Sequence, residues 1–175
     1  MSAAAALNGA APTGVSGAAF RATMRRHAAG VVVVTSSSGG VANGMTATAV
    51  ASVTADPPTV LIVVNRSSQS YGLIRHGGAF ALNFLAESQQ EVASYFAGSE
   101  PKSFEAAPHR PGVRDCPLLE GCAAHLECLV EDRHEVGSHA IFIGRVVAAS
   151  AGEAAPLAYF EAGFHGLKAL QGRSG

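Results

Sequence analysis

Charged residues are scarce in this sequence. Lysine, arginine, aspartate and glutamate make up 14% of the 175 residues, and the formal net charge is -1. A nucleic-acid-binding domain normally concentrates lysine and arginine on one surface, because it must neutralise phosphates. The composition therefore excludes nucleic acid as an expected partner.

Cysteine is also rare, and its three positions do not suggest a disulfide or metal framework. Cys116, Cys122 and Cys128 are an odd number, and residues 1–15 lack the basic start of a secretory signal peptide. We therefore expect free thiols in a reducing cytoplasm. His125 lies between two of the cysteines, but on a strand it would face away from both, so no metal site is expected.

Long apolar runs are missing too, so no membrane span is expected. Residues 1–15 are rich in alanine and are interrupted by glycine and proline, which predicts a disordered tail. Residues 16–170 form one domain, which is long enough to bury about two-thirds of its unfolded surface.

The motifs of several enzyme classes are absent. The sequence has no Gly-x-Ser-x-Gly elbow, no Walker phosphate loop and no Gly-x-Gly-x-x-Gly after a strand. Hydrolase, nucleotidase and Rossmann functions therefore have no motif to support them.

Short β-branched and alternating segments dominate what is present, and they predict a mainly β fold. Cys122 to Val130, for example, alternates with a period of two, as a half-buried strand does. About seven strands in mostly sequential hairpins, with two or three short peripheral helices, predict an antiparallel barrel. The expected strands are 31–36, 41–47, 46–53, 60–64, 79–84, 122–130 and 139–147.

Two of the expected helices have recognisable starts. Ser16 can cap a helix over 17–29 whose apolar stripe, including Phe20 and Met24, should cover the core. Ser88 and Glu91 have the spacing of a capping box, which predicts a helix that ends before Gly98. The proline-rich segment 99–117 is expected to be a long, functional loop.

The stretch 43–70 organises the rest of the chain. Small residues from Thr46 to Val53 suit a strand that a flat ring approaches closely, and Asp56-Pro57-Pro58 ends that strand. Asn65 to Ser70 then supplies one cation and three hydroxyls at the start of a helix, where free amides favour an anion such as phosphate. The alternative is that Ser67 or Ser68 is only a helix cap and Arg66 a solvated surface charge.

His139 is the most interesting of the histidines. It follows Gly137-Ser138 at the start of a strand, where its ring can project over the mouth of a cleft. A surface residue without function is the alternative, because a single histidine has no local partner that defines its role.

Taken in order, these segments resemble the short-chain flavin reductases, the reductase components of two-component flavin-dependent monooxygenases. The similarity runs from about Phe20 to Phe164. The matching motifs are Ala29-Gly30-Val31-Val32-Val33-Val34-Thr35, Asn43-Gly44-Met45-Thr46 with Ser52-Val53 and Asp56-Pro57-Pro58, Asn65 to Ser70, Phe80-Ala81-Leu82-Asn83, Phe96-Ala97-Gly98, Lys102 with Phe104, Leu126-Glu127-Cys128, and Val136-Gly137-Ser138-His139 with Gly144 and Val146.

The resemblance implies an FMN-binding split β-barrel of Greek-key type and a homodimer with flavin near the interface. It implies hydride transfer from NADH or NADPH to FMN or FAD, after which reduced flavin leaves for a separate monooxygenase or halogenase. His139 would position the nicotinamide. The residues implied in flavin binding are Met45, Thr46, Ala47, Thr48, Ser52, Asn65, Arg66, Ser68, Ser70, Asn83 and Lys102.

Two positions depart from the family pattern. Ser138 replaces the usual aspartate of Gly-Asp-His, and Glu161 replaces a basic residue that usually follows the closing tyrosine-aromatic pair. Both leave the preference between NADH and NADPH open. A flavin- or haem-binding split barrel without reductase turnover and an enzyme similar to pyridoxine-phosphate oxidases are the alternative functions.

Overall fold

The computed structural model describes residues 14–98, 100, 102–105 and 107–170, so most of the expected tail at 1–15 lies outside the described residues. The helices are α1 (Gly17–Met24), α2 (Gln69–Gly77) and α3 (Gln90–Ala97), with 3-10 turns at Glu87–Gln89 and Val113–Asp115. The strands are β1 (Ala29–Gly30), β2 (Val32–Ser38), β3 (Val41–Ala47), β4 (Val50–Ala55), β5 (Pro58–Asn65), β6 (Ala79–Phe84), β7 (His109–Pro111), β8 (Pro117–Leu119), β9 (Ala124–Val136), β10 (His139–Ala151), β11 (Ala158–Phe160) and β12 (Gly163–His165). The mainly β prediction is confirmed.

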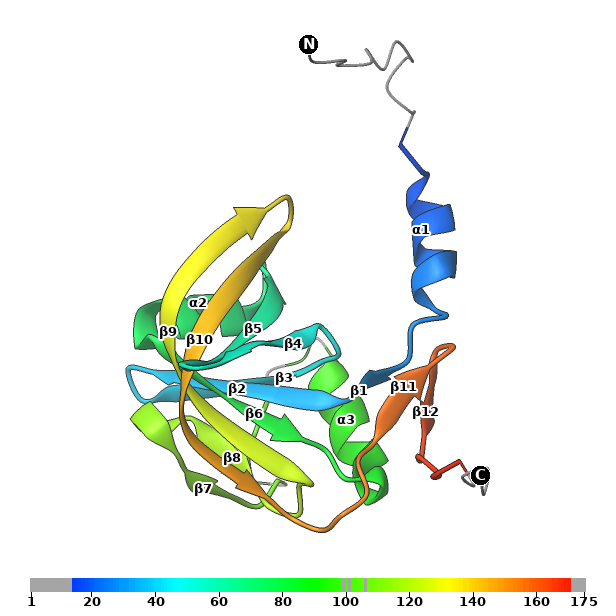
Figure 1. Cartoon of the computed structure of the whole chain (residues 1–175). Coiled ribbons are helices and arrows are strands. Elements are labelled where there is room, and N and C mark those ends of the chain that lie inside the picture. The colour runs from blue at the N-terminus through cyan, green and yellow to red at the C-terminus, as the bar shows by residue number, and fades with distance from the viewer. Residues whose placement is uncertain (1–13, 99, 101, 106, 171–175) are drawn as a thin grey trace, which may run out of the picture.

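Seven strands form one antiparallel sheet in the order β3-β2-β6-β9-β10-β5-β4 (Figure 1). The hairpins β2–β3, β4–β5 and β9–β10 join neighbours in sequence, as expected. β6 pairs with β2 and β9, and β10 pairs with β5, so the remaining neighbours come from distant parts of the chain. β9 and β10 are longer than expected, and their hairpin projects beyond the sheet (Figure 1).

The sheet curls, and the chain passes from one of its edge strands to the other at a single corner. β3 and β4 are the opposite edge strands, yet only Thr48 and Ala49 separate them in sequence. The Val50 amide donates to the Thr48 carbonyl at 3.0 Å, and the Val63 amide donates to the Ala49 carbonyl at 3.1 Å. The single strand predicted over 46–53 is therefore wrong: it is two strands with a corner at Thr48–Ala49, and this corner joins the two edge strands of the sheet.

The barrel interior is filled by β-branched and aromatic side chains, which include Ile62, Phe80 and Phe142. Gly144 on β10 makes room for Phe80, because a Cβ atom at Gly144 would lie 2.5 Å from Phe80 Cζ. The alternating apolar positions of the sequence thus correspond to the buried face of the sheet.

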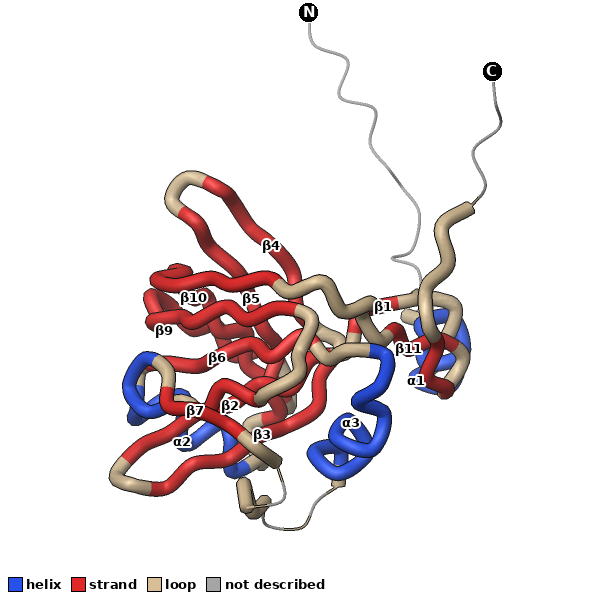
Figure 2. The backbone as a smooth tube through the Cα atoms, turned by 90° about the horizontal axis from the view of Figure 1, so that it is seen from below, coloured by secondary structure: helices blue, strands red, loops and turns tan. Residues whose placement is uncertain are grey.

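α1 does not cover the core. Ser16 caps it as predicted, because its hydroxyl accepts a hydrogen bond from the Ala19 amide at 3.2 Å. The helix ends at Met24, buries none of its residues, and extends away from the barrel (Figures 1 and 2). The prediction was wrong because helical periodicity identifies an apolar stripe but not the surface that covers it.

α3 packs on β3 through a glycine. A Cβ atom at Gly44 would lie 2.7 Å from Phe96 Cδ1, so only glycine lets the Phe96 ring approach this strand. The predicted capping box at Ser88 and Glu91 is not the one observed. Instead, the Gln89 side chain accepts a hydrogen bond from the Ala86 amide at 3.0 Å and starts a 3-10 turn before α3.

Part of the segment expected to be a long loop forms a strand. β7 lies in this segment and pairs with β8, which begins at its last residue, so that Arg110 lies opposite Leu118. Pro111 and Pro117 pair with each other at one end of this ladder, which explains why sequence patterns did not predict it, since proline weakens a strand assignment.

The three cysteines are free thiols, as expected. Burial raises the pKa of Cys116 to about 11 and that of Cys128 to about 12. These two thiols are therefore protonated at neutral pH and are poor nucleophiles.

Among the described residues, no helix is long and apolar enough to cross a membrane. The same residues contain no group of three histidine, cysteine, aspartate or glutamate side chains that could hold a metal ion.

Candidate functional site

Three adjoining hollows meet at the corner between β3 and β4, and Thr48 lines all of them. The first, of about 360 Å³, lies beside β4 and β1. Its lining residues are His27, Ala28, Ala29, Gly30, Val32, Thr48, Val50, Ala51, Ser52, Val60, Phe84 and Leu126. Small side chains therefore leave the backbone of the corner accessible, as a flat ligand requires.

The second hollow, of about 490 Å³, lies between β3, α3 and the β11–β12 pair. It is lined by Val31, Thr46, Ala47, Thr48, Ser94, Ala97, Tyr159, Ala162 and Phe164. The Thr46 hydroxyl donates to the Ala93 carbonyl at 2.7 Å and so fastens α3 beside the hollow. Met45 packs against the barrel core instead.

Thr46, Ala47, Thr48 and Ser52 are thus brought together at one corner, where the sequence placed the flavin ring. The third hollow, between α1 and the β11–β12 turn, was not predicted.

The turn before α2 uses its polar groups internally. The Asn65 side-chain oxygen accepts from the Ser67 amide at 3.0 Å and from the Ser67 hydroxyl at 2.9 Å. The Ser68 hydroxyl caps α2, because it accepts from the Tyr71 amide at 3.3 Å. Ser70 is almost fully buried and bonds to Asn43 at 2.8 Å. Ser68 is therefore the N-cap of α2, and the phosphate contacts of Ser68 and Ser70 stay predictions.

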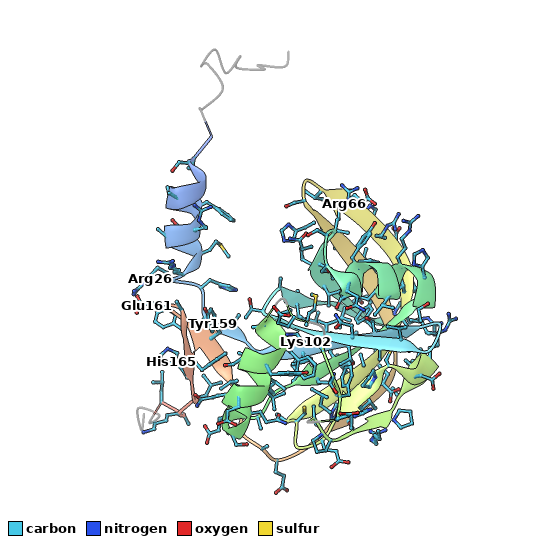
Figure 3. The ribbon with its side chains drawn as sticks, turned by 180° about the vertical axis from the view of Figure 1, so that it is seen from behind. Arg26, Arg66, Lys102, Tyr159, Glu161 and His165 are labelled. Atoms are coloured by element: carbon cyan, nitrogen blue, oxygen red, sulfur yellow. The ribbon has the colours of Figure 1, made fainter. Side chains whose placement is uncertain are left out.

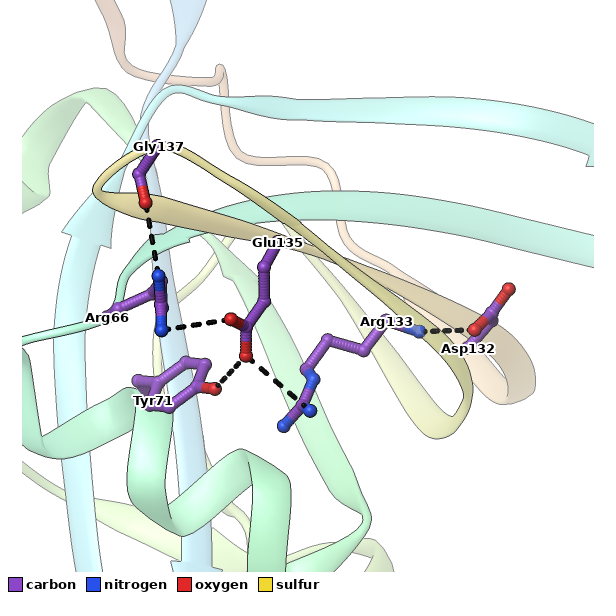
Figure 4. A network of polar contacts seen from close by, with 6 residues as sticks. All are labelled: Arg66, Tyr71, Asp132, Arg133, Glu135 and Gly137. Carbon is purple, nitrogen blue, oxygen red and sulfur yellow. Dashed lines mark hydrogen bonds and ion pairs between the residues drawn. The ribbon is translucent and has the colours of Figure 1, made fainter.

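Arg66 is neither buried nor a free surface charge. Its guanidinium lies 2.9 Å from the Glu135 carboxylate and donates to the Gly137 carbonyl at 3.2 Å (Figure 4). Both partners belong to the β9–β10 hairpin, so Arg66 ties the turn before α2 to the hairpin tip. Part of its guanidinium remains exposed and can bind an anion.

Glu135 is the centre of this contact (Figure 4). Tyr71 donates a hydrogen bond to its carboxylate at 2.9 Å, and Arg133 lies 3.6 Å away. The Tyr71 hydrogen bond, with Arg66 and Arg133 nearby, lowers the pKa of Glu135. The contact therefore needs the carboxylate form, and it is lost as the pH falls through this lowered pKa.

His139 lies next to the same turn. It is the first residue of β10 and pairs with Asn65, the last residue of β5. Its ring Nδ1 shares a hydrogen bond with the Ser138 hydroxyl at 2.9 Å, and the ring is exposed. Two segments that the sequence treated separately, 65–70 and 137–139, thus form one polar end of the molecule.

Asn83 is not available to a ligand, so its predicted contact with flavin is corrected. It has no exposed surface. Its amide nitrogen donates to the Val33 carbonyl at 3.0 Å and to the Thr35 hydroxyl at 3.1 Å, and its oxygen accepts from the Leu119 amide at 2.7 Å. These bonds tie β2 and β6 to the end of β8.

Lys102 lies at the C-terminal end of α3. Its ammonium group donates to the Tyr95 carbonyl at 2.6 Å and stands 5.0 Å from the centre of the Tyr95 ring (Figure 3). It is thus a cap of α3, and a contact with flavin stays a prediction.

The C-terminal aromatic residues are the part of the site that sequence reasoning missed. Tyr159 lines two of the hollows, and its ring packs on Phe164 with the ring centroids 5.6 Å apart. The aromatic pattern of 159–164 predicts structure there, but only the pairing of β11 with β1 brings it to the corner.

Comparison with known proteins places this geometry in a family. The model of the flavin reductase like domain matches residues 24–168. The chain is 35% identical over 151 residues to an NADH-dependent FMN reductase, RutF, of Stutzerimonas stutzeri, covering 85% of this chain and 87% of that protein.

Solved structures agree with this match. The native flavin reductase PheA2 superposes with a TM-score of 0.81 at 28% identity, covering 89% of this chain and 100% of that one. The styrene monooxygenase flavin reductase of Pseudomonas putida S12 gives a TM-score of 0.77 at 30% identity, over 87% of this chain and 99% of that one. With its curled antiparallel sheet and its corner of small residues, this chain belongs to the family of flavin reductase like domains.

Proposed function

We propose that this protein is an NAD(P)H-dependent flavin reductase, which transfers hydride to FMN or FAD and supplies the reduced flavin to a separate monooxygenase or halogenase. The observation that carries the proposal is the corner at Thr48, an open cleft of small residues in a chain of this family. RutF of S. stutzeri is an FMN reductase that uses NADH, and the P. putida relative is the reductase of a styrene monooxygenase.

The residues present fit a flavin. Thr46, Ala47, Thr48 and Ser52 line the two hollows and hold the ring and ribityl chain. Met45 directly precedes them in the flavin-binding segment. When bound, flavin supplies the redox chemistry, so the protein needs no nucleophile or acid. The protein's contribution is to hold the flavin ring and the nicotinamide ring in contact. Such positioning lowers the barrier to hydride transfer by several kcal/mol.

The phosphate lies at the turn 65–70, next to the N-terminus of α2. Arg66 supplies the charge, and the segment from Asn65 to Ser70, capped by Ser68, supplies the shape. His139 lies beside Asn65 and positions the nicotinamide.

A second copy of the chain covers the outer face of β4, β5 and β10. On this face the register places Leu61 between Ala51 and Ile143, and Val53 is 52% exposed. Leu61 and Ile143 are half-buried, and Ala51 is exposed. A row of apolar side chains that is partly exposed favours association, so the working form is a homodimer in the cytoplasm with flavin near the interface. Sedimentation measurements on the purified protein test the dimer.

The central test follows flavin absorbance without oxygen. NADH or NADPH should bleach added FMN or FAD rapidly, whereas a barrel without turnover leaves the flavin oxidised. With enzyme and NADH on one side of a membrane that passes flavin but not protein, cytochrome c on the other side should be reduced when flavin is added. Bleached flavin with oxidised cytochrome c would show that the flavin is retained, and it would end the supplier role.

Replacing His139 with alanine should slow flavin reduction or raise the KM for reduced nicotinamide by roughly ten-fold, the scale of one lost positioning contact. Flavin affinity should hardly change, because His139 lies outside the cleft that holds the ring. Stopped-flow reduction and flavin fluorescence titration measure the two effects. Weaker flavin binding with a normal rate at flavin saturation would reverse this assignment.

Replacing Glu135 with glutamine tests the phosphate site, because Glu135 competes with phosphate for Arg66. FMN affinity should rise relative to riboflavin by roughly two- to five-fold, since the exposed pair is partly screened by water. Arg66→Gln should have the opposite effect. Equal changes for FMN and riboflavin in both variants would place the phosphate elsewhere.

A further inference from the structure

The third hollow at the corner differs from the other two in its charge. It has a volume of about 330 Å³ and lies between the end of α1 and the turn that joins β11 to β12. It is lined by Arg21, Met24, Arg25, His27, Ala29, Thr48, Tyr159, Glu161 and Ala162. Thr48 and Tyr159 also line the second hollow, so the two spaces adjoin.

Positive charge is in excess here. Glu161 is the only carboxylate in the lining, and it forms an ion pair with Arg26 (Figure 3). Arg26 also lies 5.3 Å from the centre of the Phe160 ring. Within the described part of the chain, no carboxylate lies within ion-pair distance of Arg21 or Arg25, so two guanidinium groups are left for a ligand.

α1 is held at this place although none of its residues is buried. The Glu161 amide donates to the Arg25 carbonyl at 3.2 Å, and the Arg26–Glu161 pair joins the same two segments. Glu161 and Ala162 adopt φ angles of 50° and 62°, which turn the chain toward the helix. These contacts hold the end of the helix, and with it the arginines, beside the cleft.

We propose that this hollow binds the diphosphate of a dinucleotide, FAD or the reduced nicotinamide dinucleotide, whose redox-active ring lies in the adjoining cleft. The proposal rests on the proposed function. Two phosphates carry two negative charges, and arginine guanidinium groups bind phosphate oxygens in pairs of parallel hydrogen bonds. The exposed Tyr159 ring, at the boundary with the second hollow, gives the adenine an apolar surface on which to pack.

The first experiment measures binding of ADP to the whole protein by calorimetry, so its outcome does not depend on turnover. We expect Arg25→Gln to lower the affinity for ADP by roughly ten-fold, which is the scale of one hydrogen bond to a charged group. Arg21→Gln should add to this loss of affinity. Arg25→Lys keeps the charge and should retain part of the affinity. Arg110→Gln, on exposed β7 and outside the hollow, is the matched control and should not change it.

The second experiment identifies the source of the diphosphate. If the diphosphate belongs to FAD, Arg25→Gln should weaken the binding of FAD but not that of FMN. If the diphosphate belongs to the nicotinamide dinucleotide, Arg25→Gln should raise the KM for NADH but not the KM for reduced nicotinamide mononucleotide. Unchanged ADP affinity in the Arg21/Arg25 double variant would overturn the proposal, as would an equal loss of FMN and FAD. ADP binding without any flavin reduction would instead overturn the proposed function and leave this site standing.

Discussion

Asn83→Ala should lower the free energy of unfolding by about 2–5 kcal/mol, because each buried group left without a partner costs about 1–3 kcal/mol. The Leu119 amide and the Val33 carbonyl would both lose the Asn83 side chain. Urea denaturation followed by circular dichroism measures the change. Flavin affinity per folded molecule should stay the same, since Asn83 has no exposed surface.

Two further variants make this prediction sharp. Asn65→Ala removes an exposed asparagine whose bonds are confined to its own turn, and it should cost much less stability. Thr35→Val removes a hydroxyl that bonds to Asn83 and to the Pro117 carbonyl, so its effect should not add to that of Asn83→Ala. A stable Asn83→Ala protein with a selective loss of flavin binding would restore Asn83 as a flavin contact.

Local features of the fold were predictable because their causes are local. The β-branched run at 31–36 and the Gly39-Gly40 turn predict a hairpin, and β2–β3 is that hairpin. The capping serines Ser16 and Ser68 mark two helix starts, and both accept a backbone hydrogen bond. Period and turn chemistry act over a few residues, so the sequence carries them directly.

What depends on distant contacts was not predictable. The pairing of β6 with β2 and β9 is set by the packing of the whole sheet, and no motif specifies it. The apolar residues of α1 indicate a helix, but no residue of α1 is buried by the described part of the chain. The family resemblance implied a flavin contact for Asn83, yet its side chain joins three strands.

In the candidate site, too, local features were predictable and contacts between distant residues were not. Thr46 to Ser52 was predictable, because small residues on a strand permit close approach of a ring. The contact between Arg66 and Glu135 was not, because the two residues are far apart in sequence and meet only when β10 pairs with β5. Tyr159, Arg21 and Arg25 were not predictable as site residues either, because they reach the corner only when β1 pairs with β11.

Thr48→Trp should abolish most flavin binding, because Thr48 lines all three hollows and an indole would fill the space where they meet. Overfilling a packed site costs about 1–3 kcal/mol, which corresponds to a loss of flavin affinity of roughly 5- to 150-fold. Because Thr48 is exposed, the protein should remain folded. Flavin fluorescence titration and a thermal melt measure the two quantities.

Two variants complete this test. Thr48→Ser keeps a small hydroxyl at the corner and should retain flavin affinity. Val41→Trp places the same indole at a position that is 49% exposed, at the far end of β3, and should bind flavin normally. If Thr48→Trp and Val41→Trp bind FMN and riboflavin equally well, the flavin ring does not lie at this corner. A selective loss in Thr48→Trp, by contrast, would place the ring where β3 and β4 meet, because that corner is the one point that the three hollows share.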